Sequence, residues 1–226
     1  MLYLGLVAGV VAGNVAAHAA GIDALRVFLA TLVLIVFGLI GARLSHVASH
    51  WPAYRQDLRQ IWNRNQGGQD HYGGLAVILP LSVPLLAALR LPLGRFWDVA
   101  VFTLLCALVF GRIGCLLNGC CAGRGYTGWG SAYLPDHRGV WEKRIPTQCL
   151  EAVWGGVLLV SAVALRQRMP FPGALFLSFT AVYASGRLLL ISVRERSAES
   201  RLAIHYAFSL LLIVFSLATL TFRWSK

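Results

Sequence analysis

Charged residues are scarce in this sequence. Of its 226 residues, 13% are charged and 58% are hydrophobic, whereas a soluble domain carries about 25% charged residues. So few charges, combined with apolar runs of about 20 residues, exclude an ordinary soluble domain and are typical of a membrane protein. Acidic residues are the scarcest charged class, since nine of them face 20 basic residues and leave a net charge of +11.

A nucleic-acid-binding surface is also missing, despite that positive charge. The basic residues are scattered between apolar runs and form no basic helix or stripe, so we expect no nucleic acid as a partner. Positive charge in a membrane protein more simply faces anionic headgroups, and we therefore expect membrane lipids as partners.

No basic region precedes the first apolar run, which begins directly after Met1. A cleavable signal peptide normally opens with such a region. We therefore expect the first apolar run to remain in the protein as a membrane helix.

The chain has five cysteines. This odd number excludes a framework in which every cysteine is paired in a disulfide. Cys106 and Cys149 lie in apolar runs and are interpreted as small core residues. The adjacent Cys120 and Cys121 are interpreted as packing residues in a glycine-rich loop, with soft-metal binding or redox chemistry as alternatives. Because no second Cys/His cluster stands at metal-ligand spacing, we predict no metal site and no cofactor.

Seven apolar segments organise the chain, each near the length that crosses about 30 Å of hydrocarbon as a helix. They predict an all-α polytopic membrane protein with about seven transmembrane helices, built as one transmembrane domain over residues 1–226 with a short arm and loop region outside the bilayer. Residues 54–64 are predicted to form a short amphipathic surface helix. The predicted spans are approximately residues 2–20, 24–44, 73–93, 97–118, 148–166, 171–191 and 202–222.

Two arginines lie inside apolar segments, where a charge is costly unless it faces a cavity or an anion. Arg112 belongs to the glycine-rich stretch 110–124, and Arg187 follows Gly186 with four apolar residues after it. Snorkelling to the interface is the alternative interpretation. Two such residues in a small bundle predict one shared anionic ligand, and a phospholipid phosphate matches guanidinium geometry.

Two further residues are candidates for the same site. His71 opens the third apolar segment and is a possible base, since histidine titrates near neutral pH. A surface histidine at a helix start is the alternative. Glu151 lies one turn inside the fifth segment, where we expect it either to pair with an arginine or to interact favourably with the helix N-terminus.

The ordered set of motifs resembles the bacterial prolipoprotein diacylglyceryl transferases. The first match is the stretch from Gly111-Arg112 through Asn118-Gly119 to Gly123. The others, in the family's order, are Tyr3, residues 41–44, Tyr72-Gly73-Gly74, residues 144–151 and Gly186-Arg187 with Arg194. The resemblance covers nearly the whole chain.

This resemblance implies a multi-pass enzyme of the bacterial inner membrane. Such enzymes transfer the diacylglyceryl group of phosphatidylglycerol to the lipobox cysteine thiol of preprolipoproteins and form a thioether. By resemblance, Arg112 binds the phosphate and Arg187 assists catalysis, and the remaining substrate-binding residues are Asn118, Gly123, Glu151 and Tyr3. The resemblance implies that the long loops lie in the periplasm. These loops hold slightly more basic residues than those on the opposite side, and that count taken alone favours the cytoplasm.

Several positions depart from the family pattern. Tyr72 stands where the family has its proposed base histidine, so Tyr72 and the neighbouring His71 are both candidate catalytic residues. Four other polar groups of the family pattern are also replaced. An asparagine is Cys115 here, a histidine is Ile145, and two acidic residues are Cys120 and Ile191. These departures leave two alternatives open, a non-enzymatic lipid-binding or transport protein and a thiol-redox protein that uses Cys120 and Cys121. The intramembrane arginines favour the transferase over the redox protein.

Overall fold

The computed structural model of the chain describes residues 2–62, 71–136, 139–193 and 202–224. Four helices are long and apolar enough to cross a membrane, and three shorter apolar helices accompany them in this described part. The prediction of an all-α polytopic membrane protein is therefore confirmed. The chain divides into a smaller unit, Ile22–Leu93, and a larger unit, Met1–Gly21 with Gly94–Lys226.

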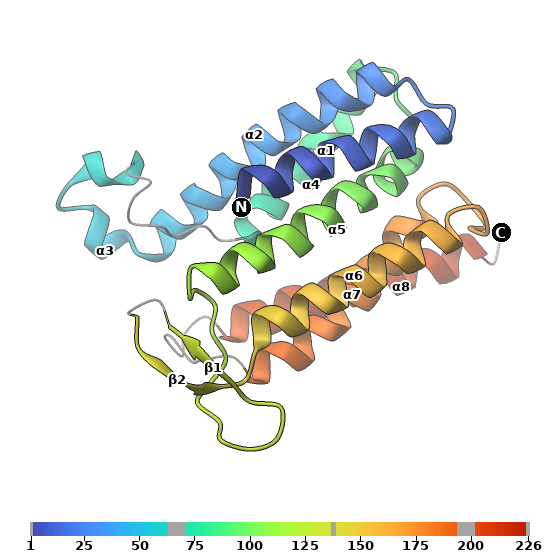
Figure 1. Ribbon diagram of the computed structural model, residues 1–226. Coiled ribbons are helices and arrows are strands. Elements are labelled where there is room, and N and C mark those ends of the chain that lie inside the picture. Colours follow the sequence, from blue (N-terminus) through green and yellow to red (C-terminus); the bar gives the residue numbers. More distant parts are fainter. Residues whose placement is uncertain (1, 63–70, 137–138, 194–201, 225–226) are drawn as a thin grey trace. The chain divides into compact units, whose positions relative to one another are not determined.

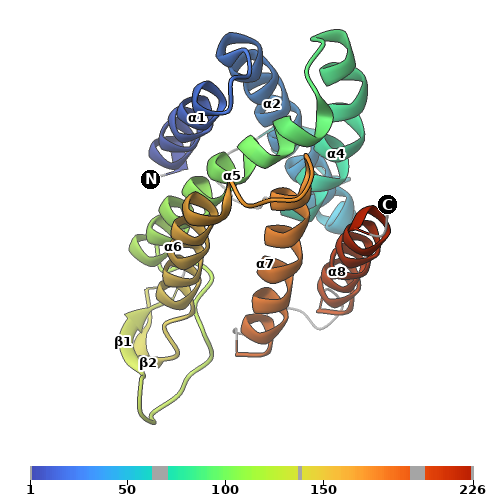
Figure 2. The same cartoon turned by 90° about the vertical axis from the view of Figure 1, so that its right-hand side faces the viewer.

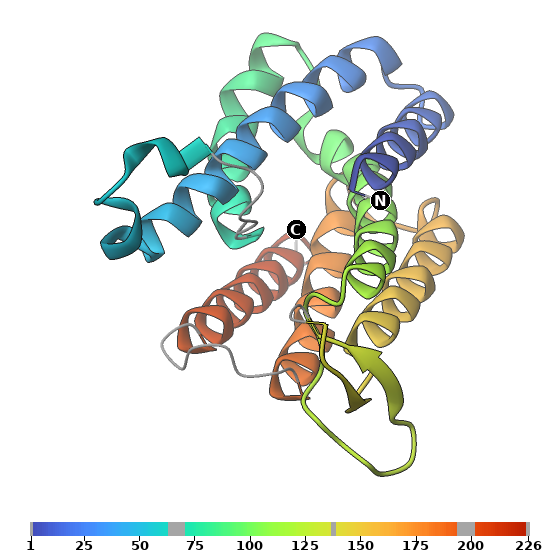
Figure 3. The ribbon, with the colours of Figure 1, turned by 60° about the vertical axis from the view of Figure 1, so that its left-hand side comes forward.

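The smaller unit contains α2 (Ala24–Ser49), α3 (Trp51–Tyr54), a 3-10 helix η1 (Leu58–Trp62) and α4 (His71–Ala88). Helices α2 and α4 lie side by side (Figure 3). Glycines make this possible, because a β-carbon on Gly74 would stand 3.0 Å from the carbonyl oxygen of Gly38. Small residues that let backbones approach closely are typical of helix contacts in membranes.

Arg43 accounts for the shape of the segment after α2. Its Nε donates a hydrogen bond of 2.7 Å to the carbonyl of Ile61, and its guanidinium lies 5.5 Å from the centre of the Tyr54 ring. The chain therefore turns back toward Arg43 through α3 and η1. The predicted single helix over residues 54–64 is wrong, because η1 is a separate short turn; residues 63 and 64 lie outside the described residues.

In the larger unit, α1 (Leu2–Ala19) packs on α5 (Leu93–Leu117) along a row of glycines (Figure 1). A β-carbon on Gly5 would stand 3.0 Å from Cβ of Phe110, and one on Gly9 would stand 2.7 Å from the carbonyl oxygen of Thr103. The first apolar segment is rich in glycine because its partner helix passes this close.

Three further helices complete the larger unit, namely α6 (Thr147–Leu165), α7 (Ala174–Val193) and α8 (Leu202–Trp224) (Figure 2). Helix α6 rests on α5 through Gly155, and α7 rests on α6 where Gly186 meets the Trp154 ring. Asp98 of α5 accepts hydrogen bonds from the backbone N–H groups of Gly173 (2.7 Å) and Phe176 (3.0 Å). This carboxylate satisfies N–H groups at the start of α7 and fixes that helix against α5.

A small antiparallel hairpin follows α5 at the same end as the start of α6 (Figure 1). Strand β1 (Ala132–Pro135) pairs with β2 (Trp141–Arg144), so that Ala132 stands opposite Arg144. The side chain of Arg144 is buried and forms ion pairs with Asp136 (3.2 Å) and Glu142 (2.8 Å). The sequence indicated only a polar loop here.

We expect Gly9→Ala to destabilise the protein, because the added methyl group would collide with the backbone oxygen of Thr103 rather than with a flexible side chain. The expected loss is about 1–3 kcal/mol, the usual range for overpacking. It is measured as the unfolding midpoint in detergent. Gly156→Ala is the matched control, since its methyl group meets no other atom within 4 Å among the described residues. Equal midpoints for the two variants would contradict the α1–α5 contact.

Candidate active site

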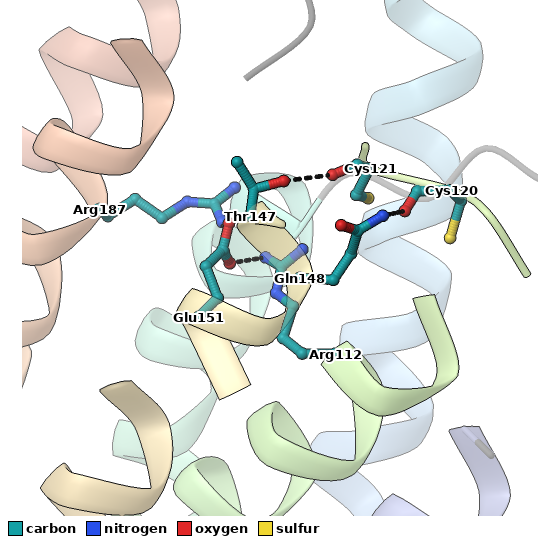
Figure 4. Close-up of polar contacts among 7 residues, drawn as sticks. All are labelled: Arg112, Cys120, Cys121, Thr147, Gln148, Glu151 and Arg187. Atoms are coloured by element: carbon teal, nitrogen blue, oxygen red, sulfur yellow. Dashed lines mark hydrogen bonds and ion pairs between the residues drawn. The ribbon is translucent and has the colours of Figure 1, made fainter. Parts of the chain in front are cut away.

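Two arginines and one glutamate meet where α5, α6 and α7 come together (Figure 4). Nη2 of Arg112 lies 2.5 Å from Oε2 of Glu151, and Nη1 of Arg187 lies 3.0 Å from the same oxygen. These three residues are here called the Arg–Glu cluster. All are buried: Arg112 is 4% exposed, Arg187 is 9% exposed and Glu151 is 4% exposed. The structure thus brings together the two arginines that the sequence singled out, joined by the glutamate expected to pair with one of them.

The surroundings make this arrangement strongly constrained. A charge taken out of water is costly unless it is paired and hydrogen-bonded, and breaking a buried pair typically costs about 3–5 kcal/mol. One carboxylate serves two guanidinium groups here, so the three charges sum to +1. Because this net positive charge is buried, the cluster is suited to receive an anion.

The loop after α5 is fixed to the start of α6 by side-chain hydrogen bonds (Figure 4). Thr147 Oγ1 donates to the carbonyl of Cys121 at 3.0 Å, and Gln148 Nε2 donates to the carbonyl of Cys120 at 3.0 Å. Both side chains are 1% exposed. Because Glu151 follows on the same helix, these bonds also fix the depth at which its carboxylate enters the bundle.

Thr147 and Gln148 were not among the predicted site residues. The only sequence signal was their place in the segment 144–151, which resembles the family pattern. Gln148 has a further property that the sequence could not show: its side-chain carbonyl oxygen is buried and has no hydrogen-bond partner within the described ranges. A buried acceptor of this kind is unusual and suggests contact with a ligand.

Gly123 lies in the same loop and is buried against Ile145, which lies between β2 and α6. A β-carbon there would collide with the carbonyl oxygen of Ile145. The neighbouring Arg124 exchanges backbone hydrogen bonds with the rest of the unit, donating to Val193 at 3.1 Å and accepting from Ile145 at 3.2 Å. The loop is therefore tied to the last turn of α7 as well as to α6.

Four other predicted residues are not joined to the Arg–Glu cluster in the described part of the chain. Asn118 is exposed in the turn just after α5, and Tyr3 on α1 is 71% exposed. Neither has a hydrogen bond or ion pair to the described cluster residues. His71 and Tyr72 begin α4 in the smaller unit, but their side chains lie outside the described residues, as do those of Ile191 and Arg194. Their assignment as catalytic or family-departure positions stays a prediction.

The cysteines gather more closely than expected. Cys115, in the last turn of α5, lies beside Cys120 and Cys121, and the three sulfur atoms are all within 4.8 Å of one another. None of the chain's five cysteines, all in the described part, is in a disulfide. Hydrogen bonds with the Cys115 and Cys121 thiols, together with burial, raise the pKa of the Cys120 thiol far above its usual range.

Comparison with known proteins gives a consistent result. Residues 1–222 match the family model described as prolipoprotein diacylglyceryl transferase. A curated phosphatidylglycerol–prolipoprotein diacylglyceryl transferase of Dehalococcoides mccartyi (strain BAV1) is 31% identical over 174 residues, which cover 74% of this chain and 65% of that protein. One of Clostridioides difficile (strain 630) is 25% identical over 197 residues, covering 87% of this chain and 77% of that protein.

A relative of the same name from Nocardia farcinica is 29% identical over 186 residues, which cover 72% of this chain and 37% of that protein. The chain thus spans slightly less than two thirds of the length of the Dehalococcoides relatives it matches. The match to the family model nevertheless extends from α1 to α8 and includes the whole Arg–Glu cluster. The chain belongs to the prolipoprotein diacylglyceryl transferase family.

Proposed function

We propose that the protein transfers the diacylglyceryl group of phosphatidylglycerol to a cysteine thiol in the lipobox segment of a preprolipoprotein. The observation that carries this proposal is the buried Arg–Glu cluster in a chain of this family. Relatives are named for this reaction. Phosphatidylglycerol, the lipobox segment and the surrounding membrane lipids are therefore its proposed partners.

The chemistry needs a strong anion site. The acceptor sulfur, as thiolate, attacks the glycerol carbon that carries the phosphate, so that a C–S bond forms while the C–O bond to phosphate breaks. The electron pair of that bond leaves with glycerol phosphate, whose negative charge grows in the transition state. Arg112 and Arg187 stabilise this charge, because fixed donors in a water-poor site need no reorganisation as the reaction proceeds.

Glu151 acts as a positioning residue in this proposal. Its carboxylate holds one donor from each guanidinium and so sets the distance between the two arginines before lipid binds. The unpartnered carbonyl oxygen of Gln148 adds an acceptor beside the cluster, suited to a glycerol hydroxyl of the headgroup. Charge and hydrogen bonding together would distinguish phosphatidylglycerol from a lipid without a glycerol headgroup.

Apolar space along α6, α7 and α8 supports a lipid substrate. An open cavity of about 350 Å³ lies between α6, α7 and α8, and Ser185 and Gly186 in its wall directly precede Arg187. Trp154 lines both this cavity and a second one of similar volume along α6 and α7. Acyl chains would occupy such apolar surfaces while the phosphate reaches the arginines.

A non-enzymatic lipid-binding or transport protein on the same scaffold is the second candidate. The observation that favours it is the sequence departure at Tyr72 and Ile191, where the family has groups that titrate. Such a protein would use the Arg–Glu cluster to hold a phospholipid without transferring its diacylglyceryl group. Lipid binding and lipid transfer are therefore measured separately below.

We expect Arg112→Ala and Arg187→Ala each to lower the transfer rate on the order of 100-fold or more, the scale of losing one transition-state donor. Arg112→Lys should also impair transfer, because lysine keeps the charge but not the planar pair of donors. The measurement follows labelled diacylglyceryl from phosphatidylglycerol to a lipobox peptide with purified, monodisperse protein.

The matched control for these variants is Arg166→Ala, an exposed arginine at the other end of α6. It should transfer at the wild-type rate. Near wild-type transfer by both cluster variants would overturn the shared phosphate site. Saturable phosphatidylglycerol binding by the wild type with no transfer to any lipobox peptide would instead support the non-enzymatic alternative.

We expect Glu151→Gln to destabilise the fold by about 3–5 kcal/mol, because it leaves two guanidinium groups buried together without their carboxylate. Denaturant unfolding in a fixed detergent measures this. Glu142→Gln is the control, since Glu142 also pairs with an arginine but is 47% exposed at its side chain, and should cost no more than about 1 kcal/mol. Similar losses for both variants would argue against a buried cluster.

We further propose that the protein resides in the bacterial inner membrane, with the hairpin and the start of α6 in the periplasm. Three apolar helices separate the hairpin turn from Lys226, so a reporter at these two positions should give opposite results. Alkaline phosphatase inserted at the exposed Gly139 should be active, and the same enzyme fused after Lys226 should be inactive. The reverse pattern would contradict the proposed orientation.

A further inference from the structure

Three thiols converge at the end of α5, next to the Arg–Glu cluster. Cys115 comes from the last turn of the helix, and Cys120 and Cys121 come from the turn that follows it. Their sulfur atoms lie within 4.8 Å of one another, and all three residues are partly buried. Figure 4 shows Cys120 and Cys121 on the loop that Gln148 and Thr147 hold.

The backbone explains why residues five apart in the sequence meet. The N–H of Gly119 donates to the carbonyl of Leu116 at 3.3 Å, and the N–H of Cys120 donates to the carbonyl of Cys115 at 3.1 Å. With Gly119 at φ 65°, these two bonds form a Schellman motif, which brings the third-last helical residue against the residue after the glycine. Here those two residues are both cysteines.

Cys121 joins them in an unfavourable backbone conformation. Its φ is 60°, a region that glycine adopts freely and other residues rarely adopt. The loop has glycines at 119 and 123, yet a cysteine occupies this strained position, and its carbonyl is held by Thr147. Residues that the surroundings hold in such a conformation cluster at functional sites.

The spacing of the sulfur atoms suits a single soft metal ion. Zinc bound tetrahedrally at about 2.3 Å from each sulfur separates two sulfurs by about 3.8 Å. Thiolates select zinc or copper(I) over magnesium or calcium. Three protein ligands with a fourth position left open is the arrangement of catalytic zinc, whereas structural zinc has four protein ligands.

We propose that Cys115, Cys120 and Cys121 bind one zinc ion, whose fourth position takes the thiol of the acceptor cysteine. The second half of this statement rests on the proposed transferase function. The sequence predicted no metal site because no second Cys/His cluster stands at metal-ligand spacing, and only the fold brings Cys115 to Cys120 and Cys121 to make three ligands.

The metal would supply what the reaction needs beside the phosphate site. A thiol of ordinary pKa, about 8.5, is mostly protonated near neutral pH, whereas a metal-bound thiol is deprotonated. The proton passes to solvent when the thiol binds. The bound sulfur then forms the C–S bond, glycerol phosphate leaves with the C–O electron pair, and the uncharged thioether dissociates from zinc, whose oxidation state does not change.

Helix α5 places the two halves of this chemistry together. Arg112 and Cys115 are three residues apart on one helix and so share a face. The guanidinium that holds the phosphate and the first thiol of the metal site are therefore one helical turn apart. Helix α6 contacts both the phosphate site and the thiols. Its Glu151 pairs with Arg112, and its Gln148 donates a hydrogen bond to the carbonyl of Cys120.

The metal site is tested without any activity measurement. Reduced, purified protein should contain or take up one zinc per chain by elemental analysis, and cobalt(II) should produce thiolate-to-metal charge-transfer absorption. Cys115→Ser, Cys120→Ser and Cys121→Ser should each weaken zinc binding at least ten-fold. Cys106→Ser and Cys149→Ser, on α5 and α6 but outside the three-thiol group, should leave it unchanged.

Because a serine variant could fold poorly, the wild-type titration decides the metal site by itself. Reduced wild-type protein that binds neither zinc nor cobalt(II) would overturn the proposal, as would binding that survives all three serine substitutions. Oxidation of two of the three thiols to a disulfide in protein purified under argon, with no metal bound, would overturn it as well.

The fourth ligand has its own test. Adding a lipobox peptide to the cobalt(II) protein should increase the thiolate charge-transfer absorption, and the same peptide with serine in place of its cysteine should not. No change with either peptide would overturn the role of the open position. Zinc bound by a protein that transfers nothing would disprove the transferase function and leave the metal site standing, so the two failures are distinguishable.

Discussion

The sharing of one carboxylate oxygen by two guanidinium groups is the interaction on which the larger unit depends. Arg112, Glu151 and Arg187 come from three different helices, and in an apolar environment none of them could be left unpaired. The glycine contacts and the Asp98 hydrogen bonds also hold these helices together. The buried charges add a large penalty for any register in which they are not paired.

The loop between α5 and α6 depends on that register. Thr147 and Gln148 precede Glu151 on α6, so the depth of the glutamate in the bundle sets where their side chains meet the carbonyls of Cys121 and Cys120. A shift of α6 by one residue would break both hydrogen bonds together with the ion pairs. The polar loop is therefore ordered by the same interaction that orders the helices, and its position is coupled to the site.

Much of this could be predicted from the sequence, because the relevant signals are local. Long apolar runs identify membrane helices, and a charge inside such a run marks a position that needs a partner; Arg112, Arg187 and Glu151 were singled out in this way, and the structure pairs them. The hairpin was missed because four-residue strands in a polar loop give no clear periodicity. Asp98 was missed because its partners are backbone N–H groups far along the chain at residues 173 and 176.

The cysteine group shows where sequence reasoning fails for a physical reason. Spacing rules for metal sites assume ligands on a common helix face or in a simple loop. Cys115 is separated from the pair Cys120 and Cys121 by four residues, and this spacing fits neither arrangement. Only the left-handed turn at Gly119 makes Cys115 and Cys120 neighbours. The same turn ends α5 just beyond Arg112. One helix terminus therefore fixes both Arg112 of the Arg–Glu cluster and the three thiols, and any change of that terminus would move both at once.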